Sequence, residues 1–168
     1  MTPDQASMLL GINTKDVGQE AQTTRKVLAA VPEDKASWTP YHEKAMSALD
    51  LAWHIASTEV WFLHGVAAGE FTPEDGKRPE SVKTLADVVA YYDANLGPAL
   101  EKAKGISGEA AAKIVDFYGA FQLPAVVYLS FLVKHSVHHR GQLSTYLRAM
   151  GAKVPSIYGG SADEPFMG

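Results

Sequence analysis

Apolar residues recur every three or four positions in four segments of the chain, which is the spacing of amphipathic α-helices. The first predicted helix begins near Thr2 and Pro3, a pair suited to a helix start, and ends before Pro32. Gly11 and Gly18 weaken its middle, which leaves open a break there. Its apolar positions are Met8, Leu9, Ile12, Val17, Val27 and Leu28.

A second helix is predicted from Ser47 to about Ala68, because Ser47 can cap it and Asp50, three residues later, forms a variant of the capping box. Residues 32–46 before it hold two prolines and are predicted to form a loop, with Trp38 as the one buried anchor. The apolar positions of this helix are Leu49, Ala52, Trp53, Ala56, Val60 and Leu63.

A third helix is predicted to start at Ser81 or Thr84, after a loop over residues 69–81 that is rich in Gly, Pro and charge. Gly97 and Pro98 leave the position of its end open. Its apolar positions follow helical spacing and are Leu85, Val88, Val89, Tyr92, Leu96 and Leu100.

The last helix is predicted from Pro124 to Met150, with Gly151 as a left-handed cap. Residues 105–122 before it suggest either a short helix or an extended excursion, and the turn-rich tail from 152 is expected to lie across the surface. Four helices of about twenty residues, with few strand signals, predict an all-α fold, an antiparallel four-helix bundle. A chain of 168 residues fits one domain, spanning residues 1–168.

Composition narrows the classes of function. The net charge of −4 and the pI of about 5.8 offer no concentrated basic surface, so we expect no nucleic-acid partner. The chain has no cysteine, which excludes disulfides, thiol nucleophiles and Cys-based metal sites and leaves His, Asp and Glu as metal ligands. The N-terminus does not resemble a signal peptide, and the longest apolar stretch, residues 120–133, is shorter than the ~18 residues of a membrane span. We therefore expect a soluble, cytoplasmic protein without a membrane partner.

The stretch "KHSVHHRGQL", residues 134–143, holds three of the chain's six histidines. His135 and His139 are four positions apart on one helix face, with Cβ atoms ~5–6 Å apart, so both rings can reach one ion at the ~2.0–2.1 Å of a zinc–nitrogen bond. His138 is rotated by about 60–100° from either of them and lies at the flank of that face. The face also carries Tyr128, Phe131, Leu132, Gln142, Tyr146 and Met150, which makes it the inward, largely apolar face.

The alternative is that both histidines are core residues bonded to neighbouring side chains, because a histidine pair at this spacing is a weak signal when taken alone. Two ligands also leave a zinc site incomplete, since catalytic zinc normally has three protein ligands. Of the remaining histidines, His42 is in a loop and His64 near a helix end favours a surface role. His54 lies in the middle of the second helix and is the best third ligand. Its neighbours on that face are Asp50, Leu51, Thr58 and Trp61.

Two motifs resemble those of the DinB-like four-helix metalloproteins: "LAWHIASTEVWF", residues 51–62, and "KHSVHHRGQLSTYLRAMG", residues 134–151. The lead-in over residues 27–56 and the tail "KVPSIYGGS" are also similar to that family, and the resemblance is weakest between about 70 and 118. The family's histidines fall on His54, His135 and His139, the same triad that helix geometry selects. The resemblance implies one divalent ion per chain, nickel, zinc, manganese or iron, in an open three-histidine site.

What the resemblance implies for activity is broader. Some members of the family are transferases that activate a low-molecular-weight thiol such as bacillithiol, mycothiol or glutathione, others are isomerases or hydrolases, and many have no assigned activity. A thiol or water bound to the ion would lose its proton near neutral pH. We therefore expect a thiol-dependent transferase or a metal-dependent hydrolase acting on a small molecule. The alternatives are a non-catalytic, stress-associated metal-binding protein and a helical scaffold whose histidines bind nothing.

Residues around the triad receive provisional roles. Asp50 or Thr58 could orient His54, and Trp61 lies on the same face. Gln142 and Tyr146 could bond a substrate, although Tyr146 fits a core position better. Arg140 points about 100° away from His139 and suits a salt bridge. No general base stands beside the triad, which favours a metal-activated nucleophile.

A homodimer is a further expectation, because the last helix is apolar on more than one side. Val126, Val133 and Val137 lie opposite the triad, and Leu129 and Leu147 lie at the flank. Either the chain's own helices and tail or a second copy would cover this surface.

Overall fold

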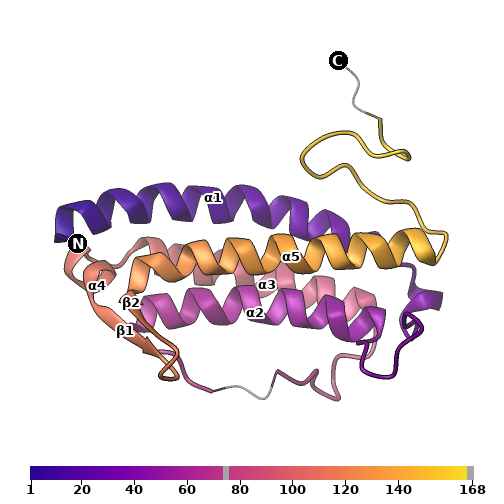
Figure 1. The fold of residues 1–168 in the computed structure, drawn as a ribbon, viewed down its shortest axis with the longest axis horizontal. Coiled ribbons are helices and arrows are strands. Elements are labelled where there is room, and N and C mark those ends of the chain that lie inside the picture. The colour runs from indigo at the N-terminus through magenta and orange to yellow at the C-terminus, as the bar shows by residue number, and fades with distance from the viewer. Residues whose placement is uncertain (74–75, 166–168) are drawn as a thin grey trace.

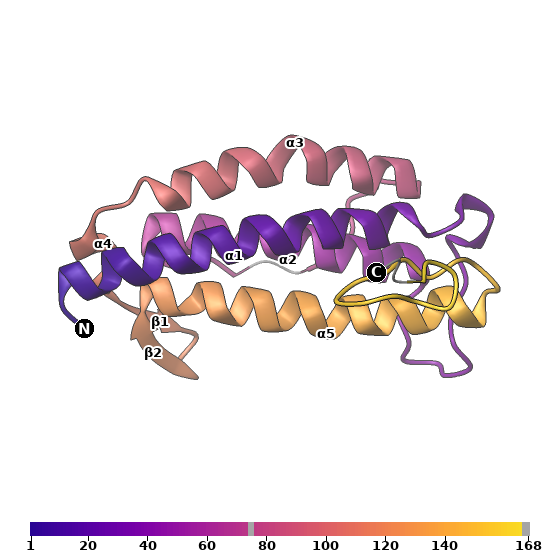
Figure 2. The same cartoon turned by 90° about the horizontal axis from the view of Figure 1, so that it is seen from above.

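The computed structural model describes residues 1–73 and 76–165 (Figure 1). Four long helices lie side by side along the long axis of the molecule, and a short helix and a two-stranded hairpin lie at one end (Figures 1 and 2). The elements are α1 (Pro3–Ala29), η1 (Glu33–Lys35), α2 (Ala48–Ala68), α3 (Leu85–Lys104), α4 (Gly108–Ala112), β1 (Ile114–Phe117), β2 (Phe121–Pro124), η2 (Ala125–Val127) and α5 (Tyr128–Ala149). None of the helices in the described ranges is long and apolar enough to cross a membrane.

Helix α1 starts as predicted, because the Thr2 side chain accepts a hydrogen bond from Gln5 N–H and the Gln5 side chain accepts one from Thr2 N–H. It runs unbroken through both glycines. The prediction was wrong for Met8 and Ile12, which are 72% and 60% exposed. The buried face of α1 is instead built largely from small and short side chains: Ala6, Leu10, Thr14, Val17, Ala21, Thr24, Val27 and Leu28. Val17, Val27 and Leu28 are buried as predicted, and the small or polar residues Ala6, Thr14, Ala21 and Thr24 complete this face, which hydrophobicity alone does not mark.

The caps of α2 and α3 follow the sequence signals. The Ser47 side chain accepts a hydrogen bond from Asp50 N–H at the start of α2. Thr84, rather than Ser81, caps α3, with a reciprocal capping box to Asp87. Helix α3 continues through Pro98 and ends at Lys104, so the proline does not end the helix.

Residues 105–122 combine both alternatives, since a short helix is followed by an extended hairpin. Strands β1 and β2 pair antiparallel, from Ile114 opposite Pro124 to Phe117 opposite Phe121. The expectation of an all-α fold is therefore wrong for this segment, and the helix-dominated character of the rest is confirmed. Pro124 ends β2 instead of starting the last helix, which begins at Tyr128 after the η2 turn.

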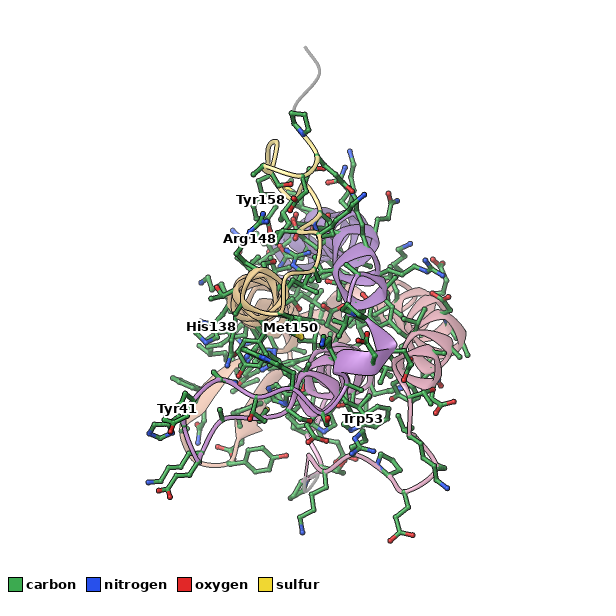
Figure 3. All side chains as sticks on the ribbon, turned by 90° about the vertical axis from the view of Figure 1, so that its right-hand side faces the viewer. Tyr41, Trp53, His138, Arg148, Met150 and Tyr158 are labelled. Atoms are coloured by element: carbon green, nitrogen blue, oxygen red, sulfur yellow. The ribbon has the colours of Figure 1, made fainter. Side chains whose placement is uncertain are left out.

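The C-terminal segment lies as expected across the surface. Gly151 has a φ of +75° just after α5, as the predicted left-handed cap requires. The segment that follows it turns back from the end of α5 and loops above the ends of α1 and α5 (Figure 1). Ion pairs from Lys26 to Glu164 and from Arg148 to Asp163 hold it there. Figure 3 shows Tyr158 and Arg148 on this side of the molecule.

The burial of Trp38 and of the apolar surface considered for a dimer differs from the prediction. Trp38 anchors its loop but is half-buried, with its ring edge-on to Tyr146 at a centroid distance of 5.0 Å. Three of the five residues considered for a dimer interface, Val126, Leu129 and Leu147, are fully buried within the chain itself. Of that surface only Val133 and Val137 retain exposure.

Candidate metal centre

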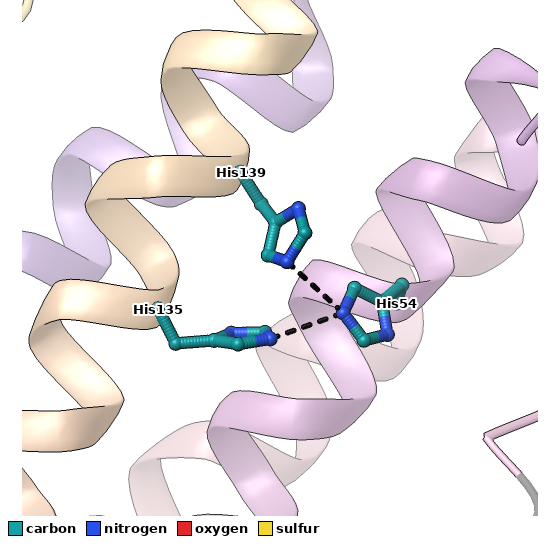
Figure 4. Close-up of side chains that lie close together, drawn as sticks. All are labelled: His54, His135 and His139. Atoms are coloured by element: carbon teal, nitrogen blue, oxygen red, sulfur yellow. Dashed lines mark hydrogen bonds between the residues drawn. The ribbon is translucent and has the colours of Figure 1, made fainter. Parts of the chain in front are cut away.

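Three histidines from two helices converge on one point (Figure 4). His54 comes from α2, and His135 and His139 come from successive turns of α5. The His54 Nε2 lies 3.0 Å from the His135 Nε2 and 3.3 Å from the His139 Nε2. Helical spacing thus brings the α5 pair together as predicted, and the contact between α2 and α5 supplies the third ring.

The spacing of these nitrogens fits ligation of a divalent ion. Three nitrogens at ~2.0–2.1 Å from a tetrahedral zinc ion lie about 3.3 Å from one another. The two Nε2 separations from His54, 3.0 and 3.3 Å, match this value within a few tenths of an ångström. In the described part of the chain, these three residues form the one group of His, Cys, Asp or Glu that could hold a metal ion.

The contact on the far side of the His139 ring decides which of its nitrogens carries the proton, whereas the His135 Nδ1 is buried with no partner among the described residues. The Oε1 atom of Gln142 lies 2.9 Å from the His139 Nδ1, and an amide oxygen accepts, so His139 carries its proton on Nδ1. The Oγ1 atom of Thr58 lies 3.5 Å from the His54 Nδ1, and a hydroxyl can either donate or accept there. The Gln142 contact leaves the His139 Nε2 lone pair pointing at the centre, which is the arrangement that a metal ligand requires.

Burial keeps these rings neutral. It lowers the pKa of His135 to about 3, helped by the charges that His139, His54 and His138 would carry. Burial also lowers the pKa of His54, followed by the effect of His139. Burial likewise lowers the pKa of His139, against an opposing hydrogen bond to Gln142. Neutral imidazole is the form that binds a metal, so the site needs no deprotonation near neutral pH.

The other histidines lie outside this centre. His138 is exposed, as expected for the flank of α5, although its ring centroid is 4.7 Å from that of His139 (Figure 3). His42 and His64 are exposed as well. The triad is thus the one inward set among the six.

The other candidate residues, Asp50, Gln142 and Tyr146, each have identified hydrogen-bond partners. The Asp50 carboxylate accepts a hydrogen bond from Ser47 and pairs with Arg78, instead of orienting His54. Gln142 contacts His139, so its role is to hold a ligand ring. Tyr146 is 5% exposed, and its hydroxyl lies 3.5 Å from the Gln142 amide nitrogen, which makes it a core residue that backs Gln142.

Two pockets border the centre and share His54 and Gly76. The larger, of about 420 Å³, lies beside Trp61, whose indole N–H donates to the Thr72 carbonyl at 3.0 Å. Its lining is His54, Ser57, Thr58, Trp61, Pro73, Gly76 and Tyr118. The second pocket, of about 360 Å³, is lined by Met46, Asp50, Trp53, His54, Gly76, Lys77 and Arg78. The centre is therefore reached from open space on the α2 side.

A second polar cluster on the same helices escaped the sequence analysis. Glu59 of α2 is 2% exposed and accepts hydrogen bonds from the Tyr92 hydroxyl at 2.5 Å and the Thr24 hydroxyl at 2.9 Å. Arg140 of α5 is 1% exposed, donates to the Thr24 hydroxyl at 3.3 Å and forms an ion pair with Glu20. We call these five residues the Glu59 network.

The Glu59 network left one signal in the sequence, a lone carboxylate inside the apolar run "LAWHIASTEVWF". A charge in such a run must be paired or neutralised within the core. Burial raises the pKa of Glu59, and the hydrogen bonds and the charge of Arg140 oppose this. The salt bridge expected for Arg140 is confirmed, but it is buried rather than at the surface.

The sequence matches a known protein family and two known proteins. Residues 14–165 match the model of the DinB family. Two proteins of Bacillus subtilis are similar in sequence: YrdA, 26% identical over 146 residues, covering 86% of this chain and 85% of YrdA, and YjoA, 26% identical over 130 residues, covering 76% of this chain and 82% of YjoA.

Solved structures show the same fold. The DinB-like protein YjoA superposes with a TM-score of 0.70 at 20% identity, over 86% of this chain and 96% of YjoA. A DinB-like protein from Bacillus cereus gives 0.68 at 21% identity, over 87% and 95%. A mutant of a mycothiol-dependent maleylpyruvate isomerase gives 0.53 at 14% identity, over 94% of this chain and 66% of the isomerase. The chain belongs to the DinB family.

Proposed function

We propose that this member of the DinB family binds one divalent metal ion through His54, His135 and His139 and uses it to activate a small-molecule thiol or water. The activity would be that of a thiol-dependent transferase or a metal-dependent hydrolase. The observation that carries the proposal is the convergence of three Nε2 atoms beside a pocket. The His54 Nε2 lies 3.0 Å from that of His135 and 3.3 Å from that of His139.

The donor set favours a reactive site over a structural one. Structural zinc sites are closed by four protein ligands, whereas catalytic sites keep an open position. The described residues supply three ligands here, all neutral, and His54 faces two pockets. Neutral ligands leave the full charge of the cation available to polarise a bound group. This argues against the alternative of a non-catalytic metal-binding protein.

A bound divalent ion would supply one thing, a lowered pKa for a thiol or water in the open position. The protein's own residues do the rest. Gln142 holds the His139 ring with its Nε2 turned inward, and Thr58 contacts the far side of His54. Among the described residues, no carboxylate lines the larger pocket, and Asp50 in the second pocket is paired with Arg78.

Two considerations bear on the co-reactant and the ion. The fold similarity to a mycothiol-dependent isomerase supports a thiol as the co-reactant. Imidazole ligands suit zinc, nickel and iron, whereas manganese prefers oxygen donors. We therefore propose nickel, zinc or iron ahead of manganese.

Three finer expectations belong with this proposal. The four long helices are proposed to form the antiparallel four-helix bundle predicted from the sequence, and the protein is proposed to act in the cytoplasm. A homodimer is proposed in which two copies pack together through the part of α5 around Val133 and Val137. The Val137 side chain is 37% exposed. Light scattering on the purified protein tests the dimer, and a monomer mass at all concentrations would rule it out.

The metal site is tested by elemental analysis of protein purified without a histidine tag. The wild type is expected to retain about one ion per chain, and the His54→Ala and His135→Ala variants to retain none. His138→Ala is the matched control, because it removes an exposed ring next to the same helix face. Equal loss in His138→Ala, or no ion in the wild type after loading and desalting, would contradict the proposal.

A further inference from the structure

The larger pocket beside His54 is walled by rings rather than by charges. Trp61 of α2 and Tyr118 of the β1–β2 turn line it, and Pro73 adds an apolar surface. Ser57 and Thr58 contribute hydroxyls, and none of the described residues in the lining is acidic, Lys or Arg. From the described residues, a ligand here meets aromatic and apolar surfaces, two hydroxyls and one imidazole.

The backbone of Tyr118 has a left-handed conformation that is unfavourable for an aromatic residue. Its φ of +54° makes it the one non-glycine residue in the described ranges with a left-handed backbone. Asn or Gly adopts this conformation more readily than an aromatic residue. The turn itself is held by other groups, since Gly119 N–H donates to the Asp116 carboxylate at 3.0 Å and Ala120 N–H to the Phe117 carbonyl at 3.0 Å. The tyrosine ring is thus not needed to close the turn.

The hairpin that carries Tyr118 is firmly anchored. Phe117, next to it, stacks on Tyr128 with centroids 5.6 Å apart and meets Phe71 edge-on at 5.1 Å. Phe117 also contacts the Trp61 ring at 5.8 Å. The Tyr128 hydroxyl donates to the Val115 carbonyl at 2.8 Å, which ties β1 to α5. Tyr118 is therefore presented to the pocket from a rigid base.

The second pocket, across Gly76, differs in character. It contains the ion pair between Arg78 and Asp50 and also Lys77. A charged group is better solvated there, and a neutral ring is better placed in the larger pocket, which Trp61 and Tyr118 line. His54 is common to both pockets, so a ring in the larger one lies beside the triad.

We propose that the site takes a small neutral compound with an aromatic ring attached close to its reacting atom, and that Tyr118 together with Trp61 selects the ring. This inference rests on the proposed function, because the reacting atom would be held at the ion bound by His54. A pocket of about 420 Å³ lies within the range of small-molecule sites.

The test compares two thiol probes on protein loaded with cobalt, whose visible absorption reports ligation by sulfur. Phenylmethanethiol carries a ring and ethanethiol does not. We expect the aromatic thiol to bind the wild type about tenfold more tightly, because its ring is buried between two aromatic side chains. Equal affinities with cobalt bound would overturn the aromatic specificity and leave the metal proposal intact.

Substitutions assign the preference to Tyr118. Tyr118→Asn removes the ring and suits the left-handed backbone, so the preference is expected to fall to about twofold or less while the melting temperature stays unchanged or rises. Tyr118→Phe keeps the ring and is expected to keep the preference. Tyr41→Asn, in an exposed loop, is the matched control. An undiminished preference in Tyr118→Asn would exclude Tyr118 as the selecting residue.

A metal-free experiment separates the pocket from the ion. Saturation-transfer NMR with benzyl alcohol is expected to show contact of the ring protons with metal-free wild type, and a weaker signal with Tyr118→Asn. If cobalt fails to bind, the proposed function falls and this measurement alone decides whether the pocket takes a ring. No signal for the wild type would overturn the pocket proposal.

Discussion

Helices α2 and α5 carry two polar clusters on different faces, and the clusters are satisfied in opposite ways. His135 and His139 alternate along α5 with Ser136 and Arg140, and one residue step rotates a side chain by about 100°. In the Glu59 network, hydroxyl and guanidinium donors meet carboxylate acceptors inside the core. In the triad, three neutral rings turn their Nε2 atoms toward one another beside open pockets.

The difference teaches which cluster serves the fold and which serves chemistry. The buried ion pair and hydrogen bonds of the Glu59 network hold helices together, even though the Arg140 Nε has no partner among the described residues, and losing one partner leaves an unpaired charge. Converging lone pairs gain nothing from each other without a cation between them. The Glu59 network should therefore control stability, and the triad should control metal binding, with little exchange between the two.

The largest expected effect is on stability, from Arg140→Ala. Its removal leaves Glu20 and the buried Glu59 without their cation and should lower the free energy of unfolding by about 3–5 kcal/mol. Urea denaturation measures it. The control Arg148→Ala breaks a pair whose arginine is 53% exposed, and should cost about 1 kcal/mol or less. Similar losses in both variants would abolish the distinction between the clusters.

The next effect is stabilisation by metal. An ion that binds only the folded chain adds about 2.7 kcal/mol at a free concentration of 100 times Kd. We expect this increase, measured as a shift of the melting temperature, in the wild type and in His138→Ala. It should vanish in His54→Ala, whose metal-free stability should stay near that of the wild type. A shift that survives in His54→Ala would place the ion elsewhere.

A smaller effect is expected at the residue behind His139. Gln142→Leu removes the acceptor 2.9 Å from the His139 Nδ1 and should weaken metal affinity by about 10–100-fold without changing the unfolding midpoint of the metal-free protein. Competition with a chelator measures the affinity. Gln142→Glu, which keeps an acceptor, should retain binding, and Gln122→Leu on exposed β2 should have no effect. An unchanged affinity in Gln142→Leu would show that the contact is incidental.

A last effect is a dependence of metal-free stability on pH. Burial holds the pKa of His135 at about 3, below its usual 6.5, so the unfolded chain binds more protons as the pH falls below about 6.5. Stability should therefore decrease from pH 6.5 toward pH 3, by at most about 1.4 kcal/mol per pH unit from this residue. His135→Asn should flatten the slope between pH 6.5 and 4.5, and His64→Asn, which removes an exposed histidine outside the triad, should leave it unchanged. An identical slope in both variants would contradict the burial effect.

Most of the fold followed from local rules. Ser47, Thr84 and Gly151 mark helix ends through their own side chains or backbone freedom, so the caps were predictable from neighbouring residues alone. The hairpin was not, because its strands of four residues are held mainly by rings that come from distant positions, Phe71 and Tyr128. The partner of Asp50 was missed for the same reason, since Arg78 lies in a loop.

The sequence by itself determined the triad, because His135 and His139 are fixed by helical spacing and His54 was the one remaining histidine in the middle of a helix. Only the tertiary structure decided what surrounds it. The contact of α2 with α5 set the 3.0 and 3.3 Å separations, and the hairpin brought Tyr118 to the pocket. The Glu59 network likewise joins four helices whose pairing no local rule specifies. Spacing within a helix is a property of the backbone, whereas contact between helices depends on the packing of the whole core.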